Sequence, residues 1–223
     1  MKVIFALLLS LIALSCREPA ASEPKVIIGP NNLSPVDGAS PWHGAIGKIG
    51  SICTGFHIGQ GLVLTAGHCI KSMVCTPEAS FVWKDGNQSE ITSHCIKVIS
   101  TVENDEMDYA LLKVFPQPTH TLPLSFPDLD AIGEESPEVN LISLPLNQQL
   151  SSSGPCQLLG PDFGQRVFHD CDSTQGSSGA PLFDNQGNVT AIHNRGSLIL
   201  RKNSATLLSG IPEMKEWSVA DAL

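Results

Sequence analysis

Residues 53–69 read CTGFHIGQGLVLTAGHC, a run that begins and ends on a cysteine and carries His68 just before its end. Two further motifs follow it in order, Asp108-Tyr109-Ala110-Leu111-Leu112 and Gly176-Ser177-Ser178-Gly179-Ala180-Pro181. A serine hydroxyl is a poor nucleophile at neutral pH. It needs an imidazole to take its proton and a third group to fix the tautomer of that imidazole. The three motifs offer these groups in the chain order His, Asp, Ser.

Together the motifs resemble the chymotrypsin/trypsin superfamily of serine endopeptidases, and more closely its bacterial branch, which includes the glutamyl endopeptidases. The likeness is strongest over residues 53–69 and 172–185 and extends from about residue 25 to 211. The resemblance implies an all-β fold of two antiparallel six-stranded barrels, with the active site in the cleft between them. It also implies catalytic roles, with His68 as general base, Asp108 as orienting carboxylate, Ser178 as nucleophile, and the backbone amides of Gly176 and Ser178 as the oxyanion hole.

Composition agrees with a β-rich, non-nucleic-acid-binding protein. The 223 residues include 19 Gly and 16 Pro, and only 16% are charged, which is typical of short strands joined by turns. The formal net charge of −9 argues against a nucleic-acid partner, which would select basic patches. The proline-rich stretch that follows Phe115 reads as a linker. We therefore divide the chain into a signal peptide (1–15), a tether or pro-segment (16–25), an N-terminal barrel (26–120), a linker (121–136), a C-terminal barrel (137–211) and a short C-terminal helix (212–223).

The N-terminus is typical of an export signal. Lys2 precedes an apolar run, Val3 to Leu14, which suits a signal core and is shorter than the roughly 20 residues of a membrane span. Cys16 follows small residues at Ala13 and Ser15, in a pattern that resembles a bacterial lipoprotein box. The sequence leaves two cellular locations open. Lipidation of Cys16 would give a periplasmic or outer-membrane lipoprotein, whereas ordinary cleavage, or processing near Lys25, would give a secreted enzyme.

The cysteine count is consistent with export. There are seven cysteines, and setting Cys16 aside leaves six, an even number. The resemblance pairs Cys53 with Cys69, and proximity along the chain pairs the remaining four as Cys75–Cys95 and Cys156–Cys171. The cysteines lack the close spacing of zinc sites, and export favours disulfides. We expect no metal and no cofactor.

Two residues bear on substrate preference, and they disagree. Asp172 lies six positions before Ser178, where trypsin holds the acid that selects Arg or Lys. His193 matches the pocket histidine of glutamyl endopeptidases, which would donate to a substrate carboxylate, and Arg195 is a further polar neighbour. Asp172 and His193 could also pair with each other. We favour acidic residues before the cleaved bond, with basic residues as the alternative.

The rest of the expected binding set also comes from the resemblance. Ser173 and Thr174 follow Asp172, and Gly196 matches the segment that pairs with substrate backbone. Ser177 stands where trypsin-type enzymes carry the aspartate that receives a freed amino terminus, so that activation switch is not expected. Asn194 replaces a serine that often donates to the buried carboxylate.

These observations predict an exported bacterial serine endopeptidase that acts on polypeptides as a monomer. Contact with a membrane is expected only through a lipid on Cys16. A non-catalytic peptide-binding or adhesin protein on the same scaffold is the alternative from another class, and the intact set of three groups argues against it. An esterase-like hydrolase is a third possibility.

Overall fold

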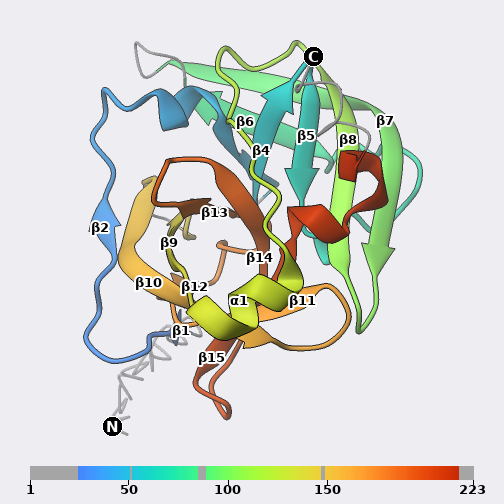
Figure 1. Cartoon of the computed structure of the whole chain (residues 1–223). Coiled ribbons are helices and arrows are strands. Elements are labelled where there is room, and N and C mark those ends of the chain that lie inside the picture. Colours follow the sequence, from blue (N-terminus) through green and yellow to red (C-terminus); the bar gives the residue numbers. More distant parts are fainter. Residues whose placement is uncertain (1–24, 51, 85–88, 147–148, 216–223) are drawn as a thin grey trace, which may run out of the picture.

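The computed structural model describes residues 25–50, 52–84, 89–146 and 149–215 (Figure 1). The expected signal peptide, Cys16, the tether up to residue 24 and the end of the C-terminal helix lie outside these residues. The described chain is mostly β-structure and forms two closed six-stranded antiparallel barrels, which confirms the predicted fold class. None of the helices in the described residues is long and apolar enough to cross a bilayer.

The first barrel has the strand order β3-β4-β5-β8-β7-β6. Its interior holds large side chains such as Phe81 and Trp83, whose stacked rings lie 5.5 Å apart, and the indole N–H of Trp83 donates to Ser93 Oγ at 2.9 Å. Residues 81–83 alternate between buried and partly exposed, because every second side chain of a strand faces the interior. The strands are β3 (Ile46–Ile49), β4 (Cys53–Gly59), β5 (Leu62–Thr65), β6 (Ser80–Lys84), β7 (Glu90–Glu103) and β8 (Asp108–Phe115).

The second barrel has the order β11-β15-β14-β13-β9-β10 and closes through pairing of β10 with β11. Leu141, Leu158, Val167 and Leu182 fill its interior without exposed surface above 1%. The strands are β9 (Glu138–Ser143), β10 (Ser151–Pro161), β11 (Arg166–His169), β13 (Pro181–Asp184), β14 (Val189–Ser197) and β15 (Lys202–Leu207).

The N-terminal segment pairs with the second barrel. Strand β1 (Lys25–Val26) runs antiparallel to β12 (Ser173–Thr174), and β2 (Ser34–Pro35) pairs with Ser151 and Ser152 of β10. The predicted N-terminal barrel (26–120) includes this segment. That assignment needs correction for this segment, because β10 and β12 offer it free strand edges far along the chain.

The stretch between the barrels contains a helix that the linker interpretation missed. Helix α1 (Leu129–Glu135) starts after Asp128, whose carboxylate accepts from the Asp130 N–H at 3.1 Å, and ends at Ser136 in a left-handed conformation. Ile132 is buried and belongs to the core of the second barrel. The signal was present in the sequence, since aspartate is a favoured helix N-cap.

One core cluster joins the two barrels. Phe56 and Leu64 of the first barrel pack in the same cluster as Ile142 and Ile192 of the second. At the end of the chain, residues 212–215 are helical, and the Tyr109 hydroxyl of β8 donates to Glu213 Oε2 at 2.9 Å. Burial and the nearby Glu213 carboxylate raise the pKa of Tyr109 to about 12. The C-terminal segment is therefore tied to the first barrel.

All three predicted disulfides are present. Cys53–Cys69 joins β4 to the short 3-10 helix η2 (Gly67–Cys69), and Cys75–Cys95 and Cys156–Cys171 follow the pairing expected from sequence proximity. For loops of 15 to 20 residues, each bond stabilises the fold by about 3 kcal/mol in the chain-entropy model.

Candidate active site

His68 lies in η2, directly after β5. Gly67 before it touches the backbone so closely that an added Cβ would lie 2.0 Å from the Val102 carbonyl oxygen, so only glycine fits. Cys69 after it is held by the disulfide to Cys53. Both neighbours therefore fix the backbone of the histidine, which leaves its side chain half-buried at the surface of the first barrel.

His68 and Asp108 meet as the sequence predicted. Asp108 Oδ2 lies 2.8 Å from His68 Nδ1, and Asp108 Oδ1 accepts the backbone N–H of His68 at 3.0 Å. The carboxylate has no exposed surface. Burial by itself raises the pKa of Asp108, but the hydrogen bonds and charge of His68, together with the charge of Arg195, outweigh it and lower that pKa. The carboxylate is therefore ionised at neutral pH and holds a proton on Nδ1, which leaves Nε2 free to act as a base.

Two residues of the second barrel hold Asp108 in place by hydrogen bonds to its backbone. The Asn194 side chain donates to the backbone carbonyl of Asp108 at 2.6 Å. The Thr206 hydroxyl accepts the backbone N–H of Asp108 at 3.0 Å and donates to Asn194 Oδ1 at 2.8 Å. Asn194 therefore reaches the aspartate through its backbone rather than through its carboxylate. Thr206 was not expected, because no short-range pattern links it to Asp108.

Ser178 sits in a tight turn before β13. Gly176 and Gly179 take φ values of +98° and +83°, which side chains disfavour. The buried Ser177 hydroxyl accepts the N–H of Thr174 at 3.3 Å and donates to Ser143 Oγ at 3.0 Å. These two hydrogen bonds hold the turn from the inside of the protein. The Thr54 N–H of β4 donates to the carbonyl of Ser178 at 2.8 Å, which joins the turn to the first barrel.

The Ser178 hydroxyl donates to the carbonyl of Asn194 at 3.1 Å in this structure. The Asn194 side chain in turn donates to the Asp108 carbonyl, so the hydroxyl is linked to Asp108 through Asn194 and is not bonded to His68. A turn about the Cα–Cβ bond would redirect it, and catalytic hydrogen bonds often form only when substrate is bound. The nucleophile role of Ser178 stays a prediction.

The two backbone N–H groups expected to form the oxyanion hole, those of Gly176 and Ser178, have no hydrogen-bond acceptor among the described residues. Gly176 packs against the 144–146 loop so tightly that an added Cβ would lie 2.7 Å from the Leu146 nitrogen. This position therefore requires glycine for both its φ value and its space.

Asp172 does not pair with His193. Its buried carboxylate accepts the backbone N–H of Ile28 at 2.8 Å and that of Asn32 at 2.7 Å. Each of the two carboxylate oxygens thus accepts one backbone N–H of the N-terminal segment. The pairing of Asp172 with His193, which the sequence left open, is wrong, and the acid is not presented as a free counter-charge for a basic side chain.

His193 is buried against a second histidine, His169 of β11, which sequence reasoning did not assign to the site. The His169 Nε2 and His193 Nδ1 atoms lie 3.0 Å apart, and neither ring is exposed by more than 2%. Burial lowers the pKa of His193 to about 3, with the charge of His68 acting in the same direction. Burial and then the neighbouring His193 also lower the pKa of His169 well below its ordinary value. Both rings are neutral at pH 7.

This buried pair predicts acid-induced destabilisation. Both folded-state pKa values lie below the unfolded value of about 6.5, so the unfolded chain binds more protons below that pH. Stability is then fully present above about pH 6.5 and is lost as the pH falls. Each histidine kept neutral costs about 2 kcal/mol at pH 5. We expect urea titrations at pH 7.5 and 5 to show a loss of about 4 kcal/mol in unfolding free energy, reduced to about 2 kcal/mol in His169→Gln.

The control for that experiment is the exposed His94, because His94→Gln should leave the pH dependence of the parent unchanged. An equal loss of stability in the parent and in His169→Gln would show that the His169–His193 pair does not cause it.

Gly196 lies on a free strand edge. Strand β13 pairs with β14 only as far as Ile192, so residues 194–196 of β14 have β15 on one side and no strand on the other. An extended peptide could pair with that edge. Val26 of β1 packs on Gly196, because an added Cβ there would lie 2.4 Å from Val26 Cγ2.

Of the other residues expected to bind substrate, Ser173 and Thr174 are buried and Arg195 is exposed. Ser173 and Thr174 are buried under β1, and the Ser173 hydroxyl donates to Asn203 Oδ1 at 3.2 Å. Arg195, by contrast, is half exposed, and its Nη2 lies 3.4 Å from Asp108 Oδ2. The cation therefore lies at the rim of the candidate site, next to the Asp108 carboxylate.

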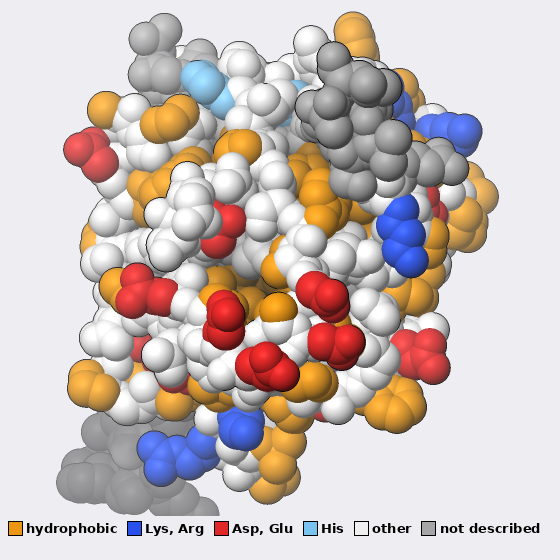
Figure 2. Space-filling model, viewed as in Figure 1, with side chains coloured by type: hydrophobic (Ala, Val, Ile, Leu, Met, Phe, Trp, Pro, Cys, Tyr) orange, Lys and Arg blue, Asp and Glu red, His pale blue; other side chains and the backbone are white. Residues whose placement is uncertain are grey.

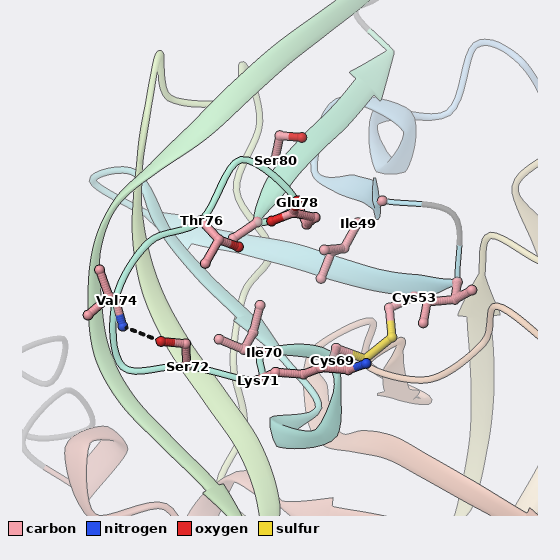
Figure 3. A pocket seen from close by; sticks show the side chains of 13 residues that line it. Ile49, Cys53, Cys69, Ile70, Lys71, Ser72, Val74, Thr76, Glu78 and Ser80 are labelled. Atoms are coloured by element: carbon pink, nitrogen blue, oxygen red, sulfur yellow. Dashed lines mark hydrogen bonds between the residues drawn. A yellow bond between two sulfur atoms is a disulfide. The ribbon is translucent and has the colours of Figure 1, made fainter.

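A hollow of about 490 Å³ lies next to the Cys53–Cys69 disulfide (Figure 3). It starts at the Cys53–Cys69 disulfide, and its wall includes Ile49, Ile70 and Val74, with Lys71 and Glu78 among the polar groups. Cys69 Sγ lies 4.0 Å from the Ser178 carbonyl oxygen, so the hollow adjoins the serine turn.

One group of potential ligand atoms occurs among the described residues, formed by Cys53, His68 and Cys69. Its two sulfurs are joined in a disulfide and are not thiolates, so they cannot serve as metal ligands. The absence of a metal stays a prediction for the chain as a whole.

Comparison with known proteins adds the following similarities. Residues 53–192 match the family model described as a trypsin-like peptidase domain. A solved Glu endopeptidase in complex with MPD is 15% identical and superposes with a TM-score of 0.67 over 88% of this chain and 100% of its own. The inactive form of the Rv3671c protease is 18% identical with a TM-score of 0.56, over 77% of this chain and 87% of its own. A mutant of Rv3671c from M. tuberculosis H37Rv gives a TM-score of 0.58 at 18% identity, over 91% and 97%. No curated protein matches the sequence.

Proposed function

The chain belongs to the trypsin-like peptidase domain family and is a serine endopeptidase, and we propose that it works through Ser178, His68 and Asp108 and prefers acidic residues before the cleaved bond. The observation that carries the catalytic part is the buried, ionised Asp108 that holds His68 by two hydrogen bonds. No other pair of described residues brings an imidazole and a carboxylate together in this way beside a serine turn.

In the proposed mechanism Ser178 Oγ attacks the carbonyl carbon of the scissile bond while His68 Nε2 takes its proton. The carbonyl oxygen becomes an oxyanion, and the unpaired amides of Gly176 and Ser178 stabilise it, each by about 3 kcal/mol. His68 then gives its proton to the leaving amine, so that an acyl-enzyme remains on Ser178. Water, deprotonated by His68, hydrolyses this ester. Asp108 keeps its charge throughout and stabilises the imidazolium.

Three observations support an acidic preference. The buried Asp172 carboxylate accepts two backbone N–H groups of the N-terminal segment, which weakens the feature that favoured basic substrates. When His193 Nδ1 accepts from His169 Nε2, the neutral His193 ring carries its proton on Nε2, where it can donate to a carboxylate. Arg195 supplies a permanent positive charge at the rim.

The orientation of the substrate follows from the free edge of β14. In this proposal the chain before the cleaved bond pairs with residues 194–196, and the chain after it passes over the Cys53–Cys69 disulfide toward the hollow of Figure 3. The hollow has an apolar wall of Ile49 and Ile70, so apolar side chains after the cleaved bond suit it.

The test is cleavage of a random peptide pool, with new termini read by mass spectrometry. We expect Glu and Asp to dominate before the cleaved bond. On two peptides that differ only by Glu or Gln at that position, Arg195→Gln should reduce kcat/KM for the Glu peptide about tenfold more than for the Gln peptide, which is the value of one hydrogen bond to a charged group.

Arg201→Gln, which removes another exposed cation, serves as the control and should leave the Glu/Gln ratio unchanged. Cleavage mainly after Lys or Arg would contradict the acidic preference. Tight peptide binding without any new termini would instead favour a binding protein, and hydrolysis of esters alone would favour an esterase.

We also propose that the enzyme is exported. Its three disulfides support this, because such bonds persist in oxidising compartments. The choice between a lipid anchor on Cys16 and a free enzyme processed near Lys25 is decided by the intact mass of the native protein, since acylation adds the mass of its fatty acids.

A further inference from the structure

The turn between β14 and β15 carries three consecutive exposed aliphatic side chains. Leu198, Ile199 and Leu200 are 62%, 94% and 60% exposed. Residues 198–201 form the turn, and the Leu200 N–H donates to Ser197 Oγ at 3.1 Å, so the turn is ordered by its own hydrogen bond. Single exposed aliphatic residues are common, but three together at a protruding tip are a contiguous apolar patch. The hairpin projects from one end of the molecule in Figure 1.

Cationic side chains flank this tip. Arg201 and Lys202 follow the three aliphatic residues directly and are exposed, and Lys202 Nζ lies 5.0 Å from the centre of the Phe168 ring. The placement is notable in a chain with a formal net charge of −9. In Figure 2, Lys and Arg side chains gather beside hydrophobic ones at the hairpin end, whereas acidic side chains lie across the middle of that view.

The described chain begins beside the same hairpin. Val26 of β1 packs on Gly196 of β14, two residues before Leu198. A fully extended chain gains at most about 3.6 Å per residue, so the residues between Cys16 and Lys25 can span no more than roughly 30 Å. A lipid on Cys16 would thus hold this end of the enzyme toward the bilayer.

We propose that the tip of the β14–β15 hairpin, residues 198–202, docks on the surface of an anionic lipid bilayer. The aliphatic side chains would enter the boundary between headgroups and acyl chains, and Arg201 and Lys202 would meet the lipid phosphates. A bilayer suits this surface better than a protein partner, because the patch is a narrow tip with a cationic flank and offers too little area for a stable protein interface. This surface is separate from the catalytic residues, and the docking requires no lipid on Cys16.

The experiment uses the chain from residue 17 onward, which carries no acyl group, and co-sedimentation with vesicles of equal phosphatidylcholine and phosphatidylglycerol. We expect binding that weakens with salt and is lost on vesicles of phosphatidylcholine alone. Replacing Leu198, Ile199 and Leu200 together by serine should lower the partition coefficient at least about tenfold. Replacing Arg201 and Lys202 by glutamine should lower it about fivefold for each cation.

The matched control is Ile96→Ser, which removes a similarly exposed aliphatic side chain (60%) from β7 and should not change binding. Peptide hydrolysis in solution should be unchanged in the hairpin variants, which shows that they are folded and separates this test from that of the catalytic proposal. Two results would overturn the docking proposal. One is equal sedimentation of the parent and the triple serine variant. The other is a parent that dimerises without vesicles through the same three residues, because the tip would then be an interface between copies.

Discussion

Ser178→Ala is expected to lower kcat for peptide hydrolysis by about 10⁶, the loss found when a triad nucleophile is removed from a serine protease. The reason is that the neighbouring hydroxyl of the turn cannot form the acyl-enzyme in its place. Ser177 is fully buried and bonded to Ser143, and its hydroxyl cannot reach substrate. Residual hydrolysis of about 10³ over water should remain, because the Gly176 and Ser178 backbone amides are untouched. The same variant should lose labelling by a fluorophosphonate.

Ser177→Ala is the control for this result. It removes the neighbouring hydroxyl and with it the bonds to Ser143 and the Thr174 N–H, so it should reduce stability while labelling persists. Labelling that survives in a folded Ser178→Ala protein, or a folded parent protein that never reacts, would refute the assignment of the nucleophile.

Asp108→Asn is expected to lower kcat by about 10⁴. The backbone N–H of His68 donates to Asp108 Oδ1, so the new amide would place its carbonyl oxygen there and turn its NH₂ toward His68 Nδ1. His68 would then accept at Nδ1 and carry its proton on Nε2, which is the wrong tautomer to deprotonate Ser178. The packing around residue 108 would change little, since Asn194 and Thr206 bond only to its backbone.

The measurement is kcat on a good peptide substrate for Asp108→Asn and for Asp105→Asn. Asp105 is an exposed acid in the loop before β8, and its replacement should leave kcat within about twofold of the parent, as for a surface substitution. A loss smaller than tenfold in Asp108→Asn would mean that another group orients His68, and Arg195 would not qualify because it offers no acceptor.

The sequence motifs were sufficient to predict that His68 and Asp108 meet, and the family resemblance of those motifs implied the two barrels. His68 is bracketed by Gly67 and the bridged Cys69, and Asp108 opens a buried strand, so each motif contains the residues that fix its own geometry. Proximity along the chain was enough for the second and third disulfides, which close short loops.

What could not be predicted depends on contacts between distant parts of the chain. The carboxylate of Asp172 accepts hydrogen bonds from the backbone N–H groups of residues 28 and 32, and no pattern near Asp172 indicates them. His169 meets His193 only because β11 and β14 both pair with β15. Helix α1 is different, because its N-cap Asp128 was visible, but prolines and acids around it favoured a linker interpretation.

The pairing of the N-terminal segment has a consequence for how the chain acquires its structure. Lys25 and Ser34 leave the ribosome before either barrel, yet their partners Thr174 and Ser152 are made only in the last third of synthesis. The segment therefore has no strand to join during most of translation, and it can close over Asp172 only as a late step of folding. The Tyr109–Glu213 hydrogen bond likewise joins the last described turn to the first barrel. The first barrel therefore gains this contact only after residue 213 has been synthesised.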